Sequence, residues 1–353
     1  MNLAFGETLV AFLIVLGLAV FMHELGHFLA AKAVGVRVLE FAFGFPPKLF
    51  TLFERNGTQY NVCALPIGGY VKLAGMEPGE DAGPDGFNSK PVWKRMLVYF
   101  AGPFMNFVLA ALVFVGMGVT VGIPDRGPDA GITRVLRHQP AEQAGFRSGD
   151  RIVAIDGRRV DMEQLLAQVR ASANRRLVIT VERNDRMVDL SVTPKASNGR
   201  TGQIGVELQA VGEPTYRRVG VLTAIAYGTE ATWKWTRDTV GGIGRMFHDA
   251  EARKQVGGPV AIARLAGYAF RDGAITFFTF LAAISVNLGV INLLPLLVVD
   301  GGHLMLLTIE WVRGRKLQPS LQISFQVVGM VLILLAVALL TVRDISNWAG
   351  GKF

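Results

Sequence analysis

The chain contains one cysteine, Cys63, in 353 residues. A single thiol cannot form an internal disulfide framework, and it cannot supply the several thiolates of a cysteine-based zinc site. The cysteine content therefore excludes both of these classes and leaves the redox compartment open.

Charge is also scarce. Only 18% of the residues are Asp, Glu, Lys or Arg, whereas 51% are hydrophobic, and the mean hydropathy is positive. This balance is typical of a membrane protein. The formal net charge is +8, but the chain has no Lys/Arg-rich run and no stripe of alternating aromatic and basic residues. We therefore exclude nucleic-acid binding, because membrane proteins are commonly basic near the inner face of the bilayer.

Four apolar runs are long enough to cross a bilayer, which takes about 20 helical residues. They cover residues 9–31, 96–123, 275–309 and 325–342. No basic residue precedes the first run, as a signal peptide would require, so we expect that run to remain as a transmembrane helix. The third run is too long for one straight span, and Pro295 together with Gly301 and Gly302 predicts a break inside it.

Basic residues gather in two of the loops between these runs. Short basic loops are normally cytoplasmic, so we expect both to face the cytoplasm and the chain ends and the long 124–274 region to lie outside it. The basic residues are Lys32, Arg37, Lys48, Arg55, Lys72, Lys90, Lys94 and Arg95 in the first loop, and Arg313, Arg315 and Lys316 in the second.

The region between the second and third runs begins with a compact unit at residues 128–211, which alternates short apolar runs with glycine-containing turns. Within it, the two strand-like runs on either side of Asn184 and Asp185 predict a hairpin. We expect a mixed α/β domain inserted into the membrane protein.

Residues 212–274 then form a helical linker in this prediction. Apolar residues recur at helical spacing over 217–247, with Trp233 and Trp235 among them. That pattern fits either a helix lying at the membrane interface or a helix packed on the inserted domain. The fold class is therefore a polytopic α-helical membrane protein, with an N-terminal membrane region at 1–127 and a C-terminal one at 275–353.

The sequence "HELGH" lies near the end of the first run, with His23 and His27 four residues apart. On a helix the two imidazoles are one turn apart on the same face, and they can converge on one zinc ion at about 2.0–2.1 Å. Glu24 can then accept a proton from the attacking water. The alternative is a chance match, but an ionisable group near the bilayer centre costs on the order of 2.5–3.5 kcal/mol, which favours a functional site.

A catalytic zinc needs a third protein ligand and an open fourth position. Asp300 is the main candidate, because it follows a long stretch without charge and comes just after the predicted helix break. His303 is the second candidate, and its alternative role is to support the ligands or to line a water-filled cavity. His138 and His248 lie in polar surroundings, and we interpret both as surface residues.

These motifs resemble those of the bacterial site-2 proteases, the intramembrane zinc metalloproteases of the regulator-of-sigma-factor branch. The "HELGH" motif fits the family's first span, and "NLLPLLVVDGG" fits its third-span motif through Asn292, Pro295, Asp300 and Gly301. Leu297 and Val299 depart from that motif, in which a proline and a leucine stand. The segment "GTQYNVCALPIGGYVKLAG" is similar to a membrane-associated β-hairpin of the family, and "PAEQAGFRSGDRIVAIDG" is similar to a PDZ domain.

The resemblance implies a zinc metalloendopeptidase of the bacterial inner membrane that cleaves single-span membrane proteins, such as anti-sigma factors or signal-peptide remnants, in regulated intramembrane proteolysis. A substrate helix must unwind before it is cut, and the edge of the extended stretch 58–73 can bind the unwound strand. We expect Gly68, Gly69 and Tyr70 to contact substrate there. Asn292 can hold the substrate too. The alternative for the 58–73 stretch is an ordinary cytoplasmic hairpin, and the alternative for Asn292 is an amide that only packs helices together. The PDZ-like domain, on the outer side, can bind peptide C-termini, exclude bulky substrates or serve as a spacer.

Two other functions fit some of these features. Intramembrane His, Glu and Asp residues also occur in metal transporters, but here they form one cluster and no inverted repeat accompanies them. A non-catalytic PDZ scaffold with a structural zinc is the second alternative. Glu24 argues against that alternative, because a structural site needs no general base.

Overall fold

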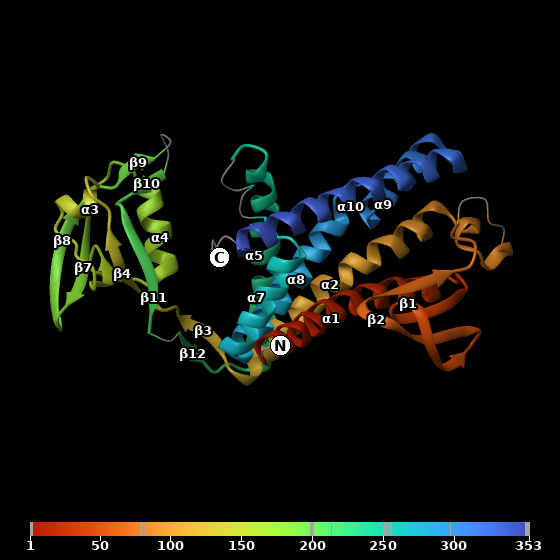
Figure 1. The fold of residues 1–353 in the computed structure, drawn as a ribbon, viewed down its shortest axis with the longest axis horizontal. Coiled ribbons are helices and arrows are strands. Elements are labelled where there is room, and N and C mark those ends of the chain that lie inside the picture. Colours follow the sequence, from red (N-terminus) through yellow and green to blue (C-terminus); the bar gives the residue numbers. More distant parts are fainter. Residues whose placement is uncertain are drawn as a thin grey trace. The chain divides into compact units, whose positions relative to one another are not determined.

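The computed structural model describes residues 3–77, 80, 82–197, 201–212, 214–249, 253, 256–296 and 298–349. The chain folds into two compact units, one formed by Met1–Gly118 with Val221–Phe353 and the other by Val119–Gly220. The ribbon in Figure 1 shows the first unit as a set of long helices beside a small sheet, and the second as a β-rich body.

Four helices in the described ranges are long and apolar enough to span a membrane: α1 (Leu3–Ala33), α2 (Val92–Thr120), α8 (Ala274–Leu293) and α10 (Pro319–Ala349). The 20 residues of α8 give a length of about 30 Å, which matches the hydrocarbon thickness of a bilayer. Only 6% of the most apolar window of α10 is buried within the protein, so most of this helix is left for lipid. The four predicted spans are confirmed.

The predicted break in the third apolar run is present. Helix α8 ends at Leu293, and α9 (Asp300–Arg313) begins after Pro295. A Cβ atom on Gly301 would lie 2.1 Å from the Leu294 carbonyl oxygen, so only glycine lets the first turn of α9 pack so closely against the end of α8. Leu297, the first departure from the site-2 protease motif, lies outside the described residues.

The stretch expected to form a hairpin is a more elaborate sheet made by β1 (Val38–Arg55) and β2 (Thr58–Leu73). The start of β1 pairs with both ends of β2, so that Phe41 is opposite Tyr60 on one side and Val71 on the other. The segment 69–73 therefore pairs on one side only, within the described residues, and forms an edge of the sheet beside α1. Several apolar side chains of β1 are at least half exposed, namely Leu49, Phe50, Leu52 and Phe53, which suits contact with lipid.

The region expected to be a linker contains two helices that belong to the membrane unit, α5 (Val221–Met246) and α7 (Pro259–Asp272). Helix α5 packs on α2 and α8, and the Thr239 hydroxyl donates a 2.7 Å hydrogen bond to Asn287 of α8. Asp344, in the last span, is 1% exposed and accepts a 2.9 Å hydrogen bond from the Ala261 amide in the first turn of α7. This acid is stabilised because it satisfies a free amide at a helix N-terminus.

The inserted unit contains a six-stranded sheet with the order β11-β4-β5-β7-β8 and β6 paired to β5. Its boundaries, 119 and 220, extend beyond the 128–211 range drawn from the sequence, because β3 and β12 pair with each other before and after the sheet. The elements are β3 (Ile123–Arg126), β4 (Asp129–Val135), α3 (Pro140–Gln143), β5 (Arg151–Ile155), β6 (Arg158–Arg159), α4 (Met162–Ala171), β7 (Leu177–Arg183), β8 (Arg186–Val192), β9 (Lys195–Ser197), β10 (Thr201–Gln203), β11 (Val206–Val211) and β12 (Thr215–Arg217).

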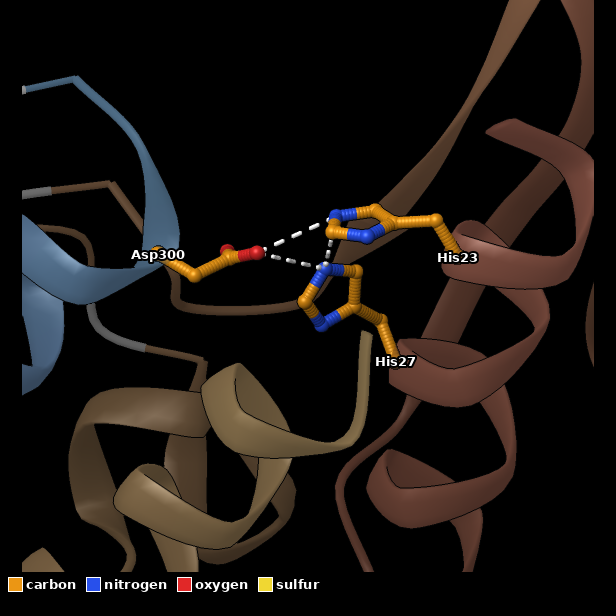
Figure 2. A group of neighbouring side chains, drawn as sticks. All are labelled: His23, His27 and Asp300. Atoms are coloured by element: carbon orange, nitrogen blue, oxygen red, sulfur yellow. Dashed lines mark hydrogen bonds and ion pairs between the residues drawn. The ribbon is translucent and has the colours of Figure 1, made fainter. Parts of the chain in front are cut away.

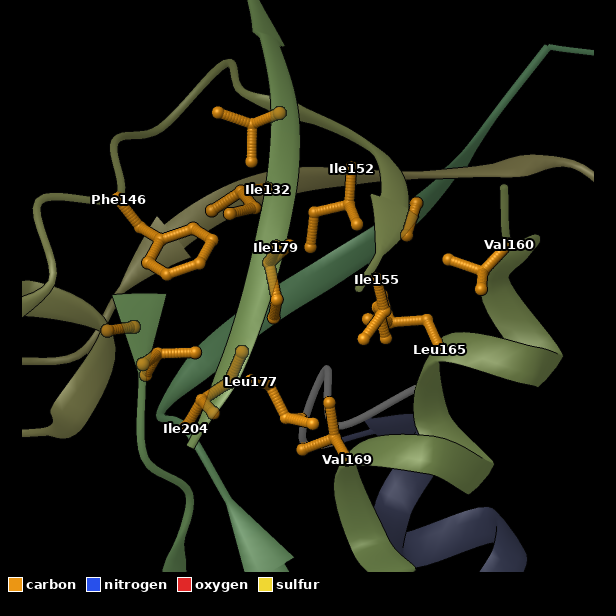
Figure 3. Close-up of a cluster of buried hydrophobic side chains, with 14 residues drawn as sticks. Ile132, Phe146, Ile152, Ile155, Val160, Leu165, Val169, Leu177, Ile179 and Ile204 are labelled. Carbon is orange, nitrogen blue, oxygen red and sulfur yellow. The ribbon is translucent and has the colours of Figure 1, made fainter. Parts of the chain in front are cut away.

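One hydrophobic core holds this unit together, with Ile152, Ile155 and Ile179 from the sheet facing Leu165 of α4 (Figure 3). Helix α4 begins at an Asp161 capping box, which satisfies amides at its N-terminus. The hairpin predicted around Asn184 and Asp185 is confirmed: β7 and β8 pair across it, and both residues have positive φ, as a two-residue type I′ turn requires.

A buried ion pair links β7 to the turn before β5. Asp150 is 1% exposed and accepts hydrogen bonds of 2.7 Å from Nε and from Nη2 of Arg183. Burial by itself raises the pKa of Asp150, but the bonds from Arg183 and from the Arg147 amide outweigh it and hold the pKa below its usual value. The pair therefore stabilises the unit above pH of about 4 and loses this effect as the pH falls toward the lowered pKa.

We predict that Asp150→Asn destabilises the inserted unit by about 2 kcal/mol at pH 7, since hydrogen bonds to a charged group are lost. Hydrogen exchange of the β5 and β7 amides in the full-length protein should be faster in the variant at pH 7, and the difference should shrink at pH 3. Asp185→Asn in the hairpin turn is the control and should exchange like wild type. Equal protection of Asp150→Asn and wild type at pH 7 would contradict the prediction.

Candidate metal centre and active site

Two elements far apart in the sequence bring three ligand-type side chains together (Figure 2). His23 and His27 extend from one face of α1, and Asp300 extends from the first turn of α9. The Oδ2 atom of Asp300 lies 3.1 Å from His23 Nε2 and 3.5 Å from His27 Nε2, and the two Nε2 atoms are 3.1 Å apart. Among the described residues these three form a group able to hold a metal ion.

The spacing of these three atoms fits a zinc ion. Ligand atoms about 2.0–2.1 Å from a tetrahedral zinc are about 3.3 Å from one another, and the observed separations are 3.1–3.5 Å. Asp300 Oδ2 is buried and has no hydrogen bond of normal geometry from the described residues, although it faces both imidazoles. A buried carboxylate oxygen without a donor is an unfavourable arrangement that a cation would relieve.

Two glycines let α1 and α2 pack closely and leave space for the imidazoles between them. A Cβ atom on Gly26 would lie 2.2 Å from the Ala101 carbonyl oxygen, and one on Gly102 would lie 2.3 Å from His27 Nε2. The second approach lets Val98 of α2 contact His27, whose Nδ1 lies 2.8 Å from the Val98 carbonyl oxygen. Since a carbonyl only accepts, Nδ1 carries a proton, and in the neutral ring that a metal ligand requires Nε2 keeps its lone pair for the centre of the group.

Glu24 lies next to this group without belonging to it. Its Cγ would be 3.5 Å from a Cβ atom on Gly69, and its carboxylate lies close to the Val71 amide. Both contacts are with the 69–73 edge of the β1–β2 sheet. Glu24 therefore lies between the group of three ligands and the sheet edge.

His303, the second candidate for the third ligand, is outside the group of three. It lies one turn after Asp300 on α9, and its ring stacks on Tyr99 of α2 with centroids 4.6 Å apart and an interplanar angle of 5°. His138 and His248 are exposed, as the sequence predicted.

Known proteins share this sequence over most of its length. The model of Peptidase family M50 matches residues 11–336. The chain belongs to peptidase family M50. The M50 relatives include a Rhizobium meliloti protein classed as a zinc metalloprotease, 33% identical over 98% of this chain and 97% of its own. They also include the regulator of sigma-W protease RasP of Bacillus subtilis, 29% identical over 97% of this chain and 99% of its own.

Similar solved structures include a bacterial PDZ domain. The PDZ domain of an SdrC-like protein from Listeria monocytogenes is 19% identical with a TM-score of 0.22, covering 24% of this chain and 93% of that domain. The family and its relatives identify the chain as an intramembrane zinc metalloprotease. They do not favour the metal transporter or the non-catalytic scaffold.

Of the four residues expected to contact substrate in this M50 protease, three lie on or next to the 69–73 edge. Gly69 begins the 69–73 edge and Gly68 precedes it, where a Cβ atom would lie 2.3 Å from the ring of Phe45. Tyr70 is on the edge too, but its hydroxyl donates a 2.8 Å hydrogen bond to Glu40. Burial and this bond raise the pKa of Tyr70 to about 12. Asn292 is half-buried in the last turn of α8.

A buried ion pair that the sequence did not reveal holds α9 against α2. Arg95 and Glu310 are each 5% exposed, and their two hydrogen bonds measure 3.2 Å and 2.5 Å. A paired, bidentate geometry is what allows two charges to be buried. The sequence does show Glu310 as a charge within a largely apolar helix, which could have indicated a buried ion pair. Its partner is 215 positions away, so the sequence did not identify it.

We predict that Gly102→Ala removes most of the bound zinc, because the added methyl group would overlap the His27 ring. Metal analysis of the purified protein should show at least a tenfold lower zinc content. Gly116→Ala in the same helix is the matched control, since nothing lies within 4 Å of its Cβ position. Equal zinc content in the two variants would contradict the packing argument.

Proposed function

We propose that His23, His27 and Asp300 hold the zinc of this protease and that Glu24 is its general base, acting on single-span membrane proteins. The proposal is carried by one observation: two nitrogens and one oxygen converge at zinc-like spacing, with Glu24 beside them against a sheet edge. When bound, zinc supplies a Lewis acid that polarises the scissile carbonyl and lowers the pKa of water.

Other residues of the protein have separate roles in this mechanism. Glu24 takes the proton of the attacking water and returns it to the leaving amine, as a general base and then a general acid. Val98 keeps the proton of His27 on Nδ1, so Nε2 stays available. The Arg95–Glu310 pair keeps α9, and with it Asp300, against α2.

We infer that substrate binds as an added strand. A transmembrane helix has its carbonyls in internal hydrogen bonds, so the cleaved segment must first unwind and then needs new backbone partners. The 69–73 edge pairs with β1 on one side only within the described residues. It also contacts Glu24, so a strand added there would pass beside the general base. In this arrangement Gly68 and Gly69 contact substrate through backbone, Tyr70 contributes its backbone and ring, and Asn292 steadies the strand from α8.

The substrate class follows from the relatives and the inserted unit. The Bacillus subtilis relative is named a regulator of sigma-W protease, and we propose membrane-tethered anti-sigma factors or signal-peptide remnants as substrates here. The sheet of the inserted PDZ-like unit ends at β11. An edge strand of this kind can bind a peptide C-terminus, and the body of the unit can exclude bulky substrates.

We predict that Glu24→Gln abolishes cleavage of a reconstituted single-span substrate while zinc stays bound. Loss of general acid–base catalysis lowers rates by about 10²–10⁴, whereas Glu24 is outside the ligand group. Zinc analysis and a cleavage assay on the same preparation measure both effects. Cleavage at the wild-type rate would rule out Glu24 as the base.

We predict that Asp300→Ala loses zinc and that His303→Ala, the matched control one turn later, keeps it. Both residues are half-buried on α9, but only Asp300 belongs to the group of three. Zinc stoichiometry of the two purified proteins tests the assignment. The reverse pattern would make His303 the third ligand.

We also propose that this inner-membrane protein places its two basic loops in the cytoplasm and the inserted unit outside it. Excess Lys and Arg in short loops sets this orientation. Reporters fused after Ser172, in the inserted unit, and after Arg315, between α9 and α10, should therefore report opposite sides. The same side for both would contradict the four-span topology.

A further inference from the structure

One amide lies deep inside the membrane helices, at Asn106 of α2. Its side chain is 0% exposed, one turn after Gly102, and its Nδ2 atom lies 3.2 Å from His23 Nδ1. Ser285 of α8 donates a 2.8 Å hydrogen bond to the Asn106 backbone oxygen, which fixes this turn of α2 beside α8. The amide therefore faces the nitrogen of His23 that points away from Asp300.

The contact matters because of where His23 carries its proton. A histidine binds zinc through a nitrogen with a free lone pair, and a neutral imidazole protonates only one of its two nitrogens. His23 Nε2 faces Asp300 and His27, so a ligand at this position must carry its proton on Nδ1. An Nδ1–H group needs an acceptor, and the Asn106 NH2 group cannot supply one.

The other end of the same amide can supply it. Asn106 Oδ1 is buried and has no hydrogen-bond partner within the described residues. A half-turn of the amide about its Cβ–Cγ bond exchanges the two ends, so that Oδ1 accepts from Nδ1–H, and Oδ1 breaks no existing bond in doing so. The two ends of an amide are assigned from the hydrogen bonds they make, and zinc binding at Nε2 selects the orientation in which Oδ1 faces His23.

The second histidine shows the same arrangement. His27 Nδ1 faces the Val98 carbonyl oxygen, an obligate acceptor, also on α2. We propose that Asn106 is a positioning residue for the zinc site: its amide oxygen accepts from His23 Nδ1–H and holds the tautomer whose Nε2 is free to bind metal. Helix α2 thereby sets the tautomer of both histidines of α1. This inference rests on the proposed ligand set.

Zinc affinity, measured by competition with a chromophoric chelator on the purified full-length protein, tests the proposal. Asn106→Leu removes the acceptor at similar volume and should weaken zinc binding by about 10–100-fold, the usual effect of losing a residue that orients a ligand. Asn106→Asp keeps an acceptor oxygen and should bind zinc at least as tightly as wild type. Asn287→Leu is the matched control, because it removes the amide that Thr239 contacts in α8 and should leave the affinity unchanged.

Two results would overturn the proposal: wild-type affinity in Asn106→Leu, or an equal loss in Asn106→Leu and Asn106→Asp. The second would mean that the amide matters as a donor or for packing. If Asn106→Leu does not fold, Asn106→Ala takes its place with the same expected loss.

A His23→Ala background separates this inference from the proposed function. His23→Ala alone should weaken zinc binding, and adding Asn106→Leu should weaken it no further, because Asn106 acts through His23. Unchanged zinc affinity in His23→Ala would refute the ligand set itself. Weak binding in His23→Ala that falls again with Asn106→Leu would refute only the role of Asn106.

Discussion

Ionisable side chains inside an apolar helix bundle need a partner that replaces bulk water, and this requirement accounts for most of the structure around the centre. A carboxylate and two imidazoles at 3.1–3.5 Å need a metal ion or a shared proton among them, because water cannot solvate them inside the bundle. Two glycines bring α1 against α2, and the break after α8 turns α9 so that Asp300 reaches the histidines. The two glycines and the helix break thus serve the same three atoms.

The same principle explains the other buried charges of the membrane unit. Glu310 is paired with Arg95, and Asp344 caps the first turn of α7. In each case a charge joins two elements that are distant in the sequence, so the polar contacts define how the apolar helices pack. Hydrophobic burial alone would allow many alternative packings of such helices, because lipid is as apolar as their surfaces.

The sequence allowed prediction of features that depend on local spacing. The four spans, the break at Pro295 and the hairpin at Asn184 and Asp185 are confirmed. The structure brings His23, His27 and Asp300 together, and their roles stay predictions. Asp300 was visible from the sequence because an isolated charge in an apolar run is unusual.

Features that depend on long-range pairing were beyond the sequence. Asn106 reaches His23 across 83 positions, and Arg95 reaches Glu310 across 215. The start of β1 pairs with both ends of β2, where the sequence predicted a simple hairpin. Alternation of apolar and polar residues indicates a strand, but it does not indicate whether the strand is paired on one side or on both. The inserted unit proved longer than 128–211 because β3 and β12, strands of four and three residues, are too short to give a periodic signal.

Zinc K-edge X-ray absorption of wild type and of Asp300→Cys tests the central claim most directly, because sulfur and oxygen ligands differ in distance. Wild type should show only nitrogen and oxygen at about 2.0–2.1 Å, with the scattering of two imidazoles, and the variant should add one sulfur at about 2.3 Å. The sole native thiol, Cys63, is buried in the β1–β2 sheet, so a sulfur signal would come from position 300. A zinc-loaded Asp300→Cys protein with no sulfur ligand would contradict the account.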